Sequence, residues 1–89
     1  MSFLAKNYNR KKISFKRGKG SYLYTTSGKK YLDFVQGIAV NCLGHAHPRL
    51  VKAIRDQSKK LWHVSNAFQI PEGEKLAKKL CQKTFAHYI

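Results

Sequence analysis

The chain has 89 residues, enough for one small domain whose core is only marginally stable. Its hydrophobic fraction of 43% is ordinary for a globular protein and argues against a disordered tail. Eighteen Lys and Arg against four Asp and Glu give a formal net charge of +14, which attracts nucleic acid without sequence specificity. Because the basic residues are scattered and form no nucleic-acid-binding motif, we expect no specific nucleic-acid partner.

Membrane and secretory signals are weak along the whole sequence. No apolar run approaches the length of a membrane span, and the apolar patch at residues 3–5 is too short for a secretory signal. We therefore expect a cytoplasmic protein without a membrane partner. In that reducing compartment Cys42 and Cys81, which lie far apart, are expected to be apolar fillers rather than a disulfide or zinc ligands.

The first half of the chain has strand and turn signals. Residues 22–24 form a short aromatic segment, and residues 26–28 (TSG) are typical of a hairpin turn. Residues 30–35 (KYLDFV) predict a second strand, which Gly37 ends. Residues 38–40 form a third short apolar segment, so we expect short antiparallel strands.

The second half has two helical patterns. Pro48 suits a first helical position, and apolar residues recur at three- and four-residue spacing as far as Trp62. A second helix is predicted from Pro71, with Glu72 and Glu74 in the first turn, where the helix dipole favours acids. The expected class is therefore α+β, with short antiparallel strands followed by two helices.

His45 and His47 are the obvious candidates for a metal site. A transition-metal site needs three or four ligands, and the other histidines, His63 and His87, lie beyond a helix. We therefore expect no metal ligands here. The alternative is structural, because imidazole nitrogens near a helix start can satisfy its unpaired backbone N–H groups.

Catalytic arrangements are incomplete at every position. Ser65 has no orienting partner for a triad, and Cys42 near His45 lacks signs of an exposed, electropositive site. Asp33 stands alone among the predicted strands, so no carboxylate pair for acid–base chemistry can be assigned. Read residue by residue, the sequence contains no complete active site, and we expect no catalytic residue.

Three motifs together resemble one family. They are the string G-x-x-Y-L-D-F-x-x-G-I-A-V at residues 28–40, L-G-H-x-H-P at residues 43–48 and L-W-H-x-S-N at residues 61–66. In combination with residues 71–86 they resemble the amino-terminal quarter of class-III aminotransferases, which depend on pyridoxal phosphate. The third motif is similar to the acetylornithine branch of that family.

The resemblance implies the type-I aminotransferase fold. That fold has a large α/β domain and a small domain built from both chain ends, and it forms a homodimer. The implied division is a basic arm at residues 1–17, antiparallel strands of the small domain at 18–47, a connecting helix and link at 48–70, and the truncated first helix of the large domain at 71–89.

The resemblance also implies an activity, the transfer of an amino group between N-acetylornithine and 2-oxoglutarate in arginine synthesis. The substrates are thus a small amino acid and a 2-oxo acid. Ile38 stands where the ornithine branch has a tyrosine that helps to choose the substrate; core packing is the alternative role for Ile38 and Val40. The implied substrate-pocket residues are Tyr8, Gly37, Ile38 and Val40, and the residues implied near the dimer interface and active site are Ser65 and Asn66.

The resemblance places the family's cofactor residues elsewhere. The phosphate-binding turn, the Schiff-base lysine and the carboxylate-binding arginine would all follow residue 89, so this chain is expected to hold no pyridoxal phosphate by itself and to be inactive alone. Two other hypotheses stay open. One is a small basic module that binds nucleic acid non-specifically, and the other is a non-functional gene remnant.

Overall fold

A computed structural model describes residues 2–89 of the protein. The chain divides after Ile54 into two compact units, which we describe separately. The division falls within helix α2 (Pro48–Ser58), so most of that helix belongs to the first unit. The first unit also contains all the strands found among the described residues.

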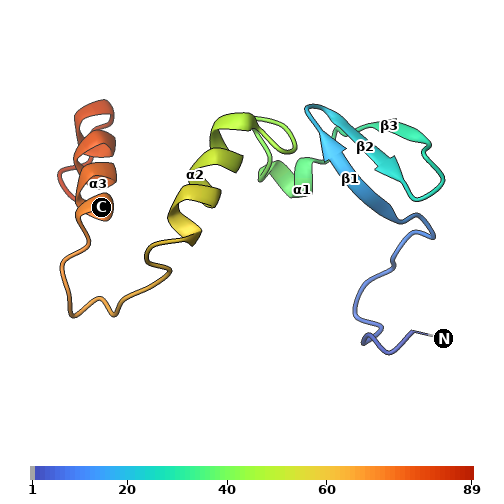
Figure 1. Ribbon diagram of the computed structural model, residues 1–89, viewed down its shortest axis with the longest axis horizontal. Helices are drawn as coiled ribbons and strands as arrows, with labels where there is room; N and C mark the ends of the chain where they lie inside the picture. Colours follow the sequence, from blue (N-terminus) through green and yellow to red (C-terminus); the bar gives the residue numbers. More distant parts are fainter. Residues whose placement is uncertain (1) are drawn as a thin grey trace. The chain divides into compact units, whose positions relative to one another are not determined.

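The first unit is built on a three-stranded antiparallel sheet. The strands β1 (Phe15–Lys19), β2 (Tyr22–Thr25) and β3 (Lys30–Leu32) are ordered β1-β2-β3, with β2 in the middle (Figure 1). The expected antiparallel strands are therefore confirmed, but two bounds differ. β1 begins at Phe15, within the stretch expected to be an arm, and β3 ends at Leu32 instead of residue 35.

Aromatic and basic side chains share the faces of this sheet. On one face the Arg17 guanidinium lies 3.8 Å from the centroid of the Tyr24 ring, and the Lys30 ammonium lies 3.8 Å from that of Tyr22. Elsewhere in the sheet Phe15 meets Tyr31 edge-on, with ring centroids 5.6 Å apart. These contacts stabilise a sheet that is too small to bury its aromatic side chains.

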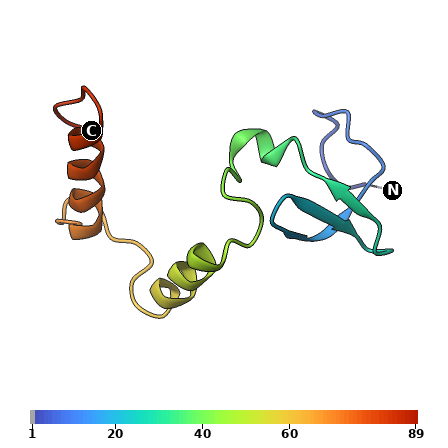
Figure 2. The ribbon, with the colours of Figure 1, turned by 90° about the horizontal axis from the view of Figure 1, so that it is seen from above.

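After β3 the chain turns sharply instead of continuing as a strand. The short turn α1 (Gln36–Ala39), green in Figure 2, has φ of 52°, 65°, 64° and 61° at its four residues, which is the left-handed region. The expectation of an extended apolar segment at residues 38–40 is thus wrong. Asp33 supplies the physical reason, because its carboxylate binds the backbone N–H groups of Val35 and Gln36 and so ends the strand.

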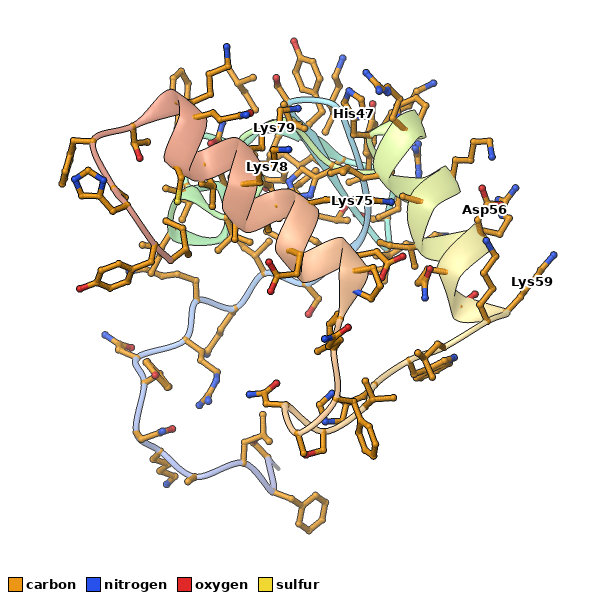
Figure 3. The ribbon with its side chains drawn as sticks, turned by 90° about the vertical axis from the view of Figure 1, so that its left-hand side faces the viewer. His47, Asp56, Lys59, Lys75, Lys78 and Lys79 are labelled. Atoms are coloured by element: carbon orange, nitrogen blue, oxygen red, sulfur yellow. The ribbon has the colours of Figure 1, made fainter. Side chains whose placement is uncertain are left out.

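The two predicted helices are confirmed. Helix α2 begins at Pro48 and ends at Ser58, short of the predicted Trp62. Helix α3 (Pro71–Lys83) follows an extended Ile70, with two acids in its first turn and a lysine in its last. Figure 3 shows three further lysines on α3, and all of them are exposed: Lys75, Lys78 and Lys79.

Burial is nearly absent in the part of the chain that the structure describes. None of the described apolar residues is buried, and the apolar stripes of α2 and α3 are largely exposed, with Ile54 and Leu76 as examples. Hydrophobic burial is the main favourable term in folding. These helices therefore present faces that need a covering surface to be stable.

Candidate functional site

Asp33 is the one buried residue among those described, and it lies just after β3. Its side chain is 4% exposed, yet both carboxylate oxygens have partners. Oδ1 accepts the backbone N–H of Val35 at 3.0 Å and that of Gln36 at 2.9 Å, while Oδ2 lies 2.6 Å from His45 Nε2. Since an ionised carboxylate can only accept, this last bond places a proton on Nε2.

The His45 ring is held from its own side by the sheet. The backbone of His45 pairs with Gly20 in an antiparallel bridge, with N–H···O distances of 2.8 and 2.9 Å. The ring lies directly against Gly18, where an added Cβ would come within 2.5 Å of His45 Cγ. At Gly44, whose φ is 84°, an added Cβ would lie 3.0 Å from the Gly20 backbone. Glycine at positions 18 and 44 therefore allows His45 to reach Asp33.

These contacts favour the ionised form of Asp33. The backbone N–H of Gln36 and then the His45 side chain hold the pKa of Asp33 below its ordinary value of 3.8, against a desolvation that raises it. The N–H of Val35 contributes in the same direction. Asp33 is thus an anionic anchor between the sheet and the turn.

The turn that Asp33 anchors is strained. A left-handed backbone costs an L-residue about 1–2 kcal/mol, and three non-glycine residues of α1 adopt it: Gln36, Ile38 and Ala39. Ile38 is β-branched and 87% exposed, so packing does not offset its strain. Strain of this kind persists where the surroundings over-determine the backbone, and it is common at functional sites.

A small cavity of about 200 Å³ lies beside the Asp33–His45 pair. Its polar lining includes Gln36 and Asn41, and the thiol-bearing Cys42 also contributes. No lysine or arginine lines the cavity. The lining residues that can carry a charge are Asp33, His45 and Cys42.

The predicted pocket residues have different surroundings. Gly37 and Ile38 lie inside the strained turn, and Val40 follows it with a φ of −83° and an exposed side chain. Tyr8 is exposed on the arm, with the Arg10 guanidinium 5.3 Å from its ring centroid. The structure therefore places two of the four inside the turn and a third directly after it, and their role in substrate binding stays a prediction.

Ser65 and Asn66 belong to the second unit, in the link between α2 and α3. Ser65 Oγ accepts the backbone N–H of Ala67 at 3.2 Å, and its carbonyl accepts that of Phe68 at 3.0 Å. Both residues are exposed within a local turn. Their expected place near a dimer interface stays a prediction as well.

The roles of the two histidines and of Asp33 were partly missed from sequence. The expectation that a histidine satisfies a backbone N–H at a helix start holds for His47, whose Nδ1 accepts the backbone N–H of Arg49 at 3.3 Å near the start of α2. That expectation does not hold for His45, whose ring binds the Asp33 side chain. Asp33 is not alone, and the twelve-residue separation of the pair explains why local spacing gave no signal.

Metal and cofactor chemistry can be tested against these side chains. Among residues 2–89 no group of three His, Cys, Asp or Glu side chains could hold a metal ion. The described residues also do not fit pyridoxal phosphate, since a Schiff-base lysine requires a desolvated amine and every described lysine is exposed. The described helices are all too short or too polar to cross a membrane.

Comparison with known proteins decides the family. The family profile described as "Aminotransferase class-III" matches residues 3–89. The chain belongs to the class-III aminotransferase family. Acetylornithine aminotransferase 1 of Bradyrhizobium diazoefficiens is a similar relative, 55% identical over 82 residues. That alignment covers 92% of this chain and 20% of the Bradyrhizobium protein.

Solved structures agree with this class-III assignment. N-acetylornithine aminotransferase from Stenotrophomonas maltophilia is 37% identical with a TM-score of 0.76, over 84% of this chain and 21% of that one. Acetylornithine aminotransferase from Elizabethkingia anophelis is 30% identical with a TM-score of 0.87, over 94% and 22%. The chain thus spans about a fifth of the length of the aminotransferases it matches, at their amino-terminal part.

Proposed function

We propose that this chain forms the amino-terminal part of an acetylornithine-type aminotransferase. The observation that carries the proposal is the 55% identity to the Bradyrhizobium diazoefficiens acetylornithine aminotransferase 1 over 82 residues. The substrates would be N-acetylornithine as amino donor and 2-oxoglutarate as acceptor, in the cytoplasmic synthesis of arginine. The complete enzyme would be a homodimer.

The chain's own contribution is to shape one wall of the substrate pocket. In the proposed enzyme Gly37, Ile38 and Val40 border the bound amino acid, and Tyr8 adds an aromatic surface. An isoleucine at position 38 offers an apolar, uncharged surface, which suits an acylated side chain better than a free ammonium group. Ser65 and Asn66 would lie toward the dimer interface.

Pyridoxal phosphate supplies the electron sink of this chemistry when it is bound. The residues described here do not hold that cofactor, and no step can be assigned to them beyond shaping the pocket. We therefore propose that the 89-residue chain is inactive by itself. The nucleic-acid and gene-remnant hypotheses predict neither a substrate pocket nor transfer of an amino group.

A chimera tests the proposal directly. Residues 1–89 replace the matched segment of the Bradyrhizobium diazoefficiens enzyme, and transfer of the amino group from N-acetylornithine to 2-oxoglutarate is measured. We expect the chimera to retain activity within about 200-fold of the parent, since one methylene more or less in a hydrophobic pocket changes rates by about 10–200-fold. A folded, cofactor-loaded chimera without activity on N-acetylornithine would contradict the proposal.

The isolated chain provides the second arm. It is mixed with pyridoxal phosphate, reduced with borohydride and digested to locate any lysine adduct, with the parent enzyme as positive control. We expect no adduct confined to one lysine and no turnover. A specific adduct accompanied by turnover would show that the chain is a complete catalyst.

A further inference from the structure

The left-handed turn α1 needs an external anchor. Its strained residues are not held by packing, because Ile38 and Val40 are both mostly exposed. The bonds within the turn, from Ile38 N–H to the Val35 carbonyl and from Val40 N–H to the Gln36 carbonyl, close it locally. They do not explain why the backbone selects the left-handed region that these residues disfavour.

Asp33 supplies contacts at the entry to the turn. Its Oδ1 accepts the N–H groups of both Val35 and Gln36, which orients the first peptide groups of the turn. The same carboxylate is tied by Oδ2 to His45. A carboxylate with both oxygens occupied has little freedom to rotate, so the direction in which the chain leaves β3 is set.

His45 connects that carboxylate to the sheet. Its backbone pairs with Gly20 at the β1–β2 turn, and its ring rests on Gly18 of β1. The charged or titratable groups lining the neighbouring cavity are Asp33, His45 and Cys42, so no other described ion there competes for the carboxylate. The turn is therefore linked to two strands through one pair of side chains.

We infer that Asp33 and His45 are positioning residues that hold the turn Gln36–Ala39 in its left-handed form and thereby aim Ile38. The claim that the orientation of Ile38 affects substrate choice rests on the proposed function. The claim that the Asp33–His45 pair holds the turn does not rest on the proposed function, because it concerns only contacts within the first unit. Both residues act through the turn, by way of the contacts of Asp33 with Val35, Gln36 and His45.

Nuclear magnetic resonance on the 89-residue chain tests the link. Carbon-13 secondary shifts and HN–Hα couplings at residues 36–39 report positive φ directly. We expect the unchanged chain to show positive φ there. Asp33→Ala and His45→Ala should each remove it, whereas Asp33→Asn should keep it, since an amide retains the Oδ1 acceptor and can donate to a neutral imidazole.

Matched controls separate this role from general damage to the fold. His47→Ala removes a nearby histidine whose Nδ1 accepts the backbone N–H of Arg49 at the start of α2, and Asp56→Asn changes an exposed carboxylate on α2. Both should leave the positive-φ signature unchanged. Absence of the signature in the unchanged chain, or its persistence in Asp33→Ala, would overturn the inference.

A second measurement addresses substrate choice in the chimera. Asp33→Ala should raise KM for N-acetylornithine at least tenfold while Asp33→Asn restores it, because a misplaced Ile38 weakens substrate binding. An unchanged KM in Asp33→Ala would refute the aiming of Ile38. If the chimera itself is inactive, the proposed function fails while the resonance result still decides the link.

Discussion

Asp33 and His45 lie twelve residues apart in sequence, and their side chains meet with Oδ2 and Nε2 2.6 Å apart. This contact joins the end of β3 to the segment that leads into α2. Asp33 is also the one buried residue in the described part of the chain. The first unit is thus organised around a polar pair instead of an apolar cluster, and its response to pH and substitution should reflect this.

Acid should loosen the first unit. The pKa of Asp33 is lowered by folding, so its stabilising contribution is fully present above its ordinary value of 3.8 and is lost as the pH falls through the lower folded-state value. We expect the positive-φ signal of the turn to weaken as the pH falls below the ordinary Asp33 pKa of 3.8. In Asp33→Asn residue 33 does not titrate, so loss of the signal should not occur at the same pH as in the unchanged chain. An identical acid step in that variant would assign the transition to other carboxyl groups.

Substitution of Gly18 should displace His45 without touching Asp33. An alanine Cβ at position 18 would lie 2.5 Å from His45 Cγ, so the ring must move. Overpacking of this kind costs about 1–3 kcal/mol, and we expect Gly18→Ala to reproduce the loss of the turn. Gly73→Ala is the matched control, because the added Cβ would meet only ordinary contacts at 3.7 Å. This substitution should stabilise helix α3 by about 1 kcal/mol. Circular dichroism and amide exchange measure both effects.

Relief of the backbone strain should stabilise the turn. Ile38 adopts a φ of 64°, so Ile38→Gly removes a penalty of about 1–2 kcal/mol and should increase amide-exchange protection in the turn. Val40→Gly is the control. Val40 is also exposed but has a φ of −83°, so glycine there should destabilise by about 0.5–1 kcal/mol. Equal effects of the two substitutions would show that strain at residue 38 is not released.

The apolar helix faces should make the isolated chain weakly cooperative. Because no described apolar residue is buried, Leu80→Ala should change stability far less than the 2–5 kcal/mol typical of a core leucine. Calorimetry of the isolated chain should show a broad transition without a sharp heat-capacity peak. The same substitution in the chimera should lower its melting temperature clearly, and a sharp melt of the isolated chain would contradict this expectation.

The net charge of +14 should give only non-specific binding of nucleic acid. We expect binding of a labelled single-stranded oligonucleotide at 20 mM salt, with no sequence preference and a steep loss of affinity toward about 150 mM. The triple substitution of Lys75, Lys78 and Lys79 by glutamine should reduce the salt dependence (Figure 3). Tight, sequence-dependent binding at the higher salt would support the binding-module hypothesis instead.

Local signals in the sequence were sufficient for much of the fold. Proline at a first helical position and apolar residues at helical spacing predicted the starts of α2 and α3, because a helix is set by interactions within four residues. The motif from Gly28 to Pro48 indicated the family, which the comparisons confirm. The candidate pocket residues also came from that motif, and their roles remain predictions.

Tertiary contacts determine the end of β3 and the left-handed turn, which local sequence signals did not predict. Apolar and aromatic side chains at residues 30–35 predicted one strand, yet the strand stops at Leu32 because Asp33 binds His45 and the N–H groups of Val35 and Gln36. Ile38 is left-handed against its own preference for the same reason. The sequence by itself determined where both helices begin, that short antiparallel strands precede them, and which family the chain belongs to. The three-dimensional structure determined the turn, because its anchor lies twelve residues from its partner and no local propensity encodes that distance.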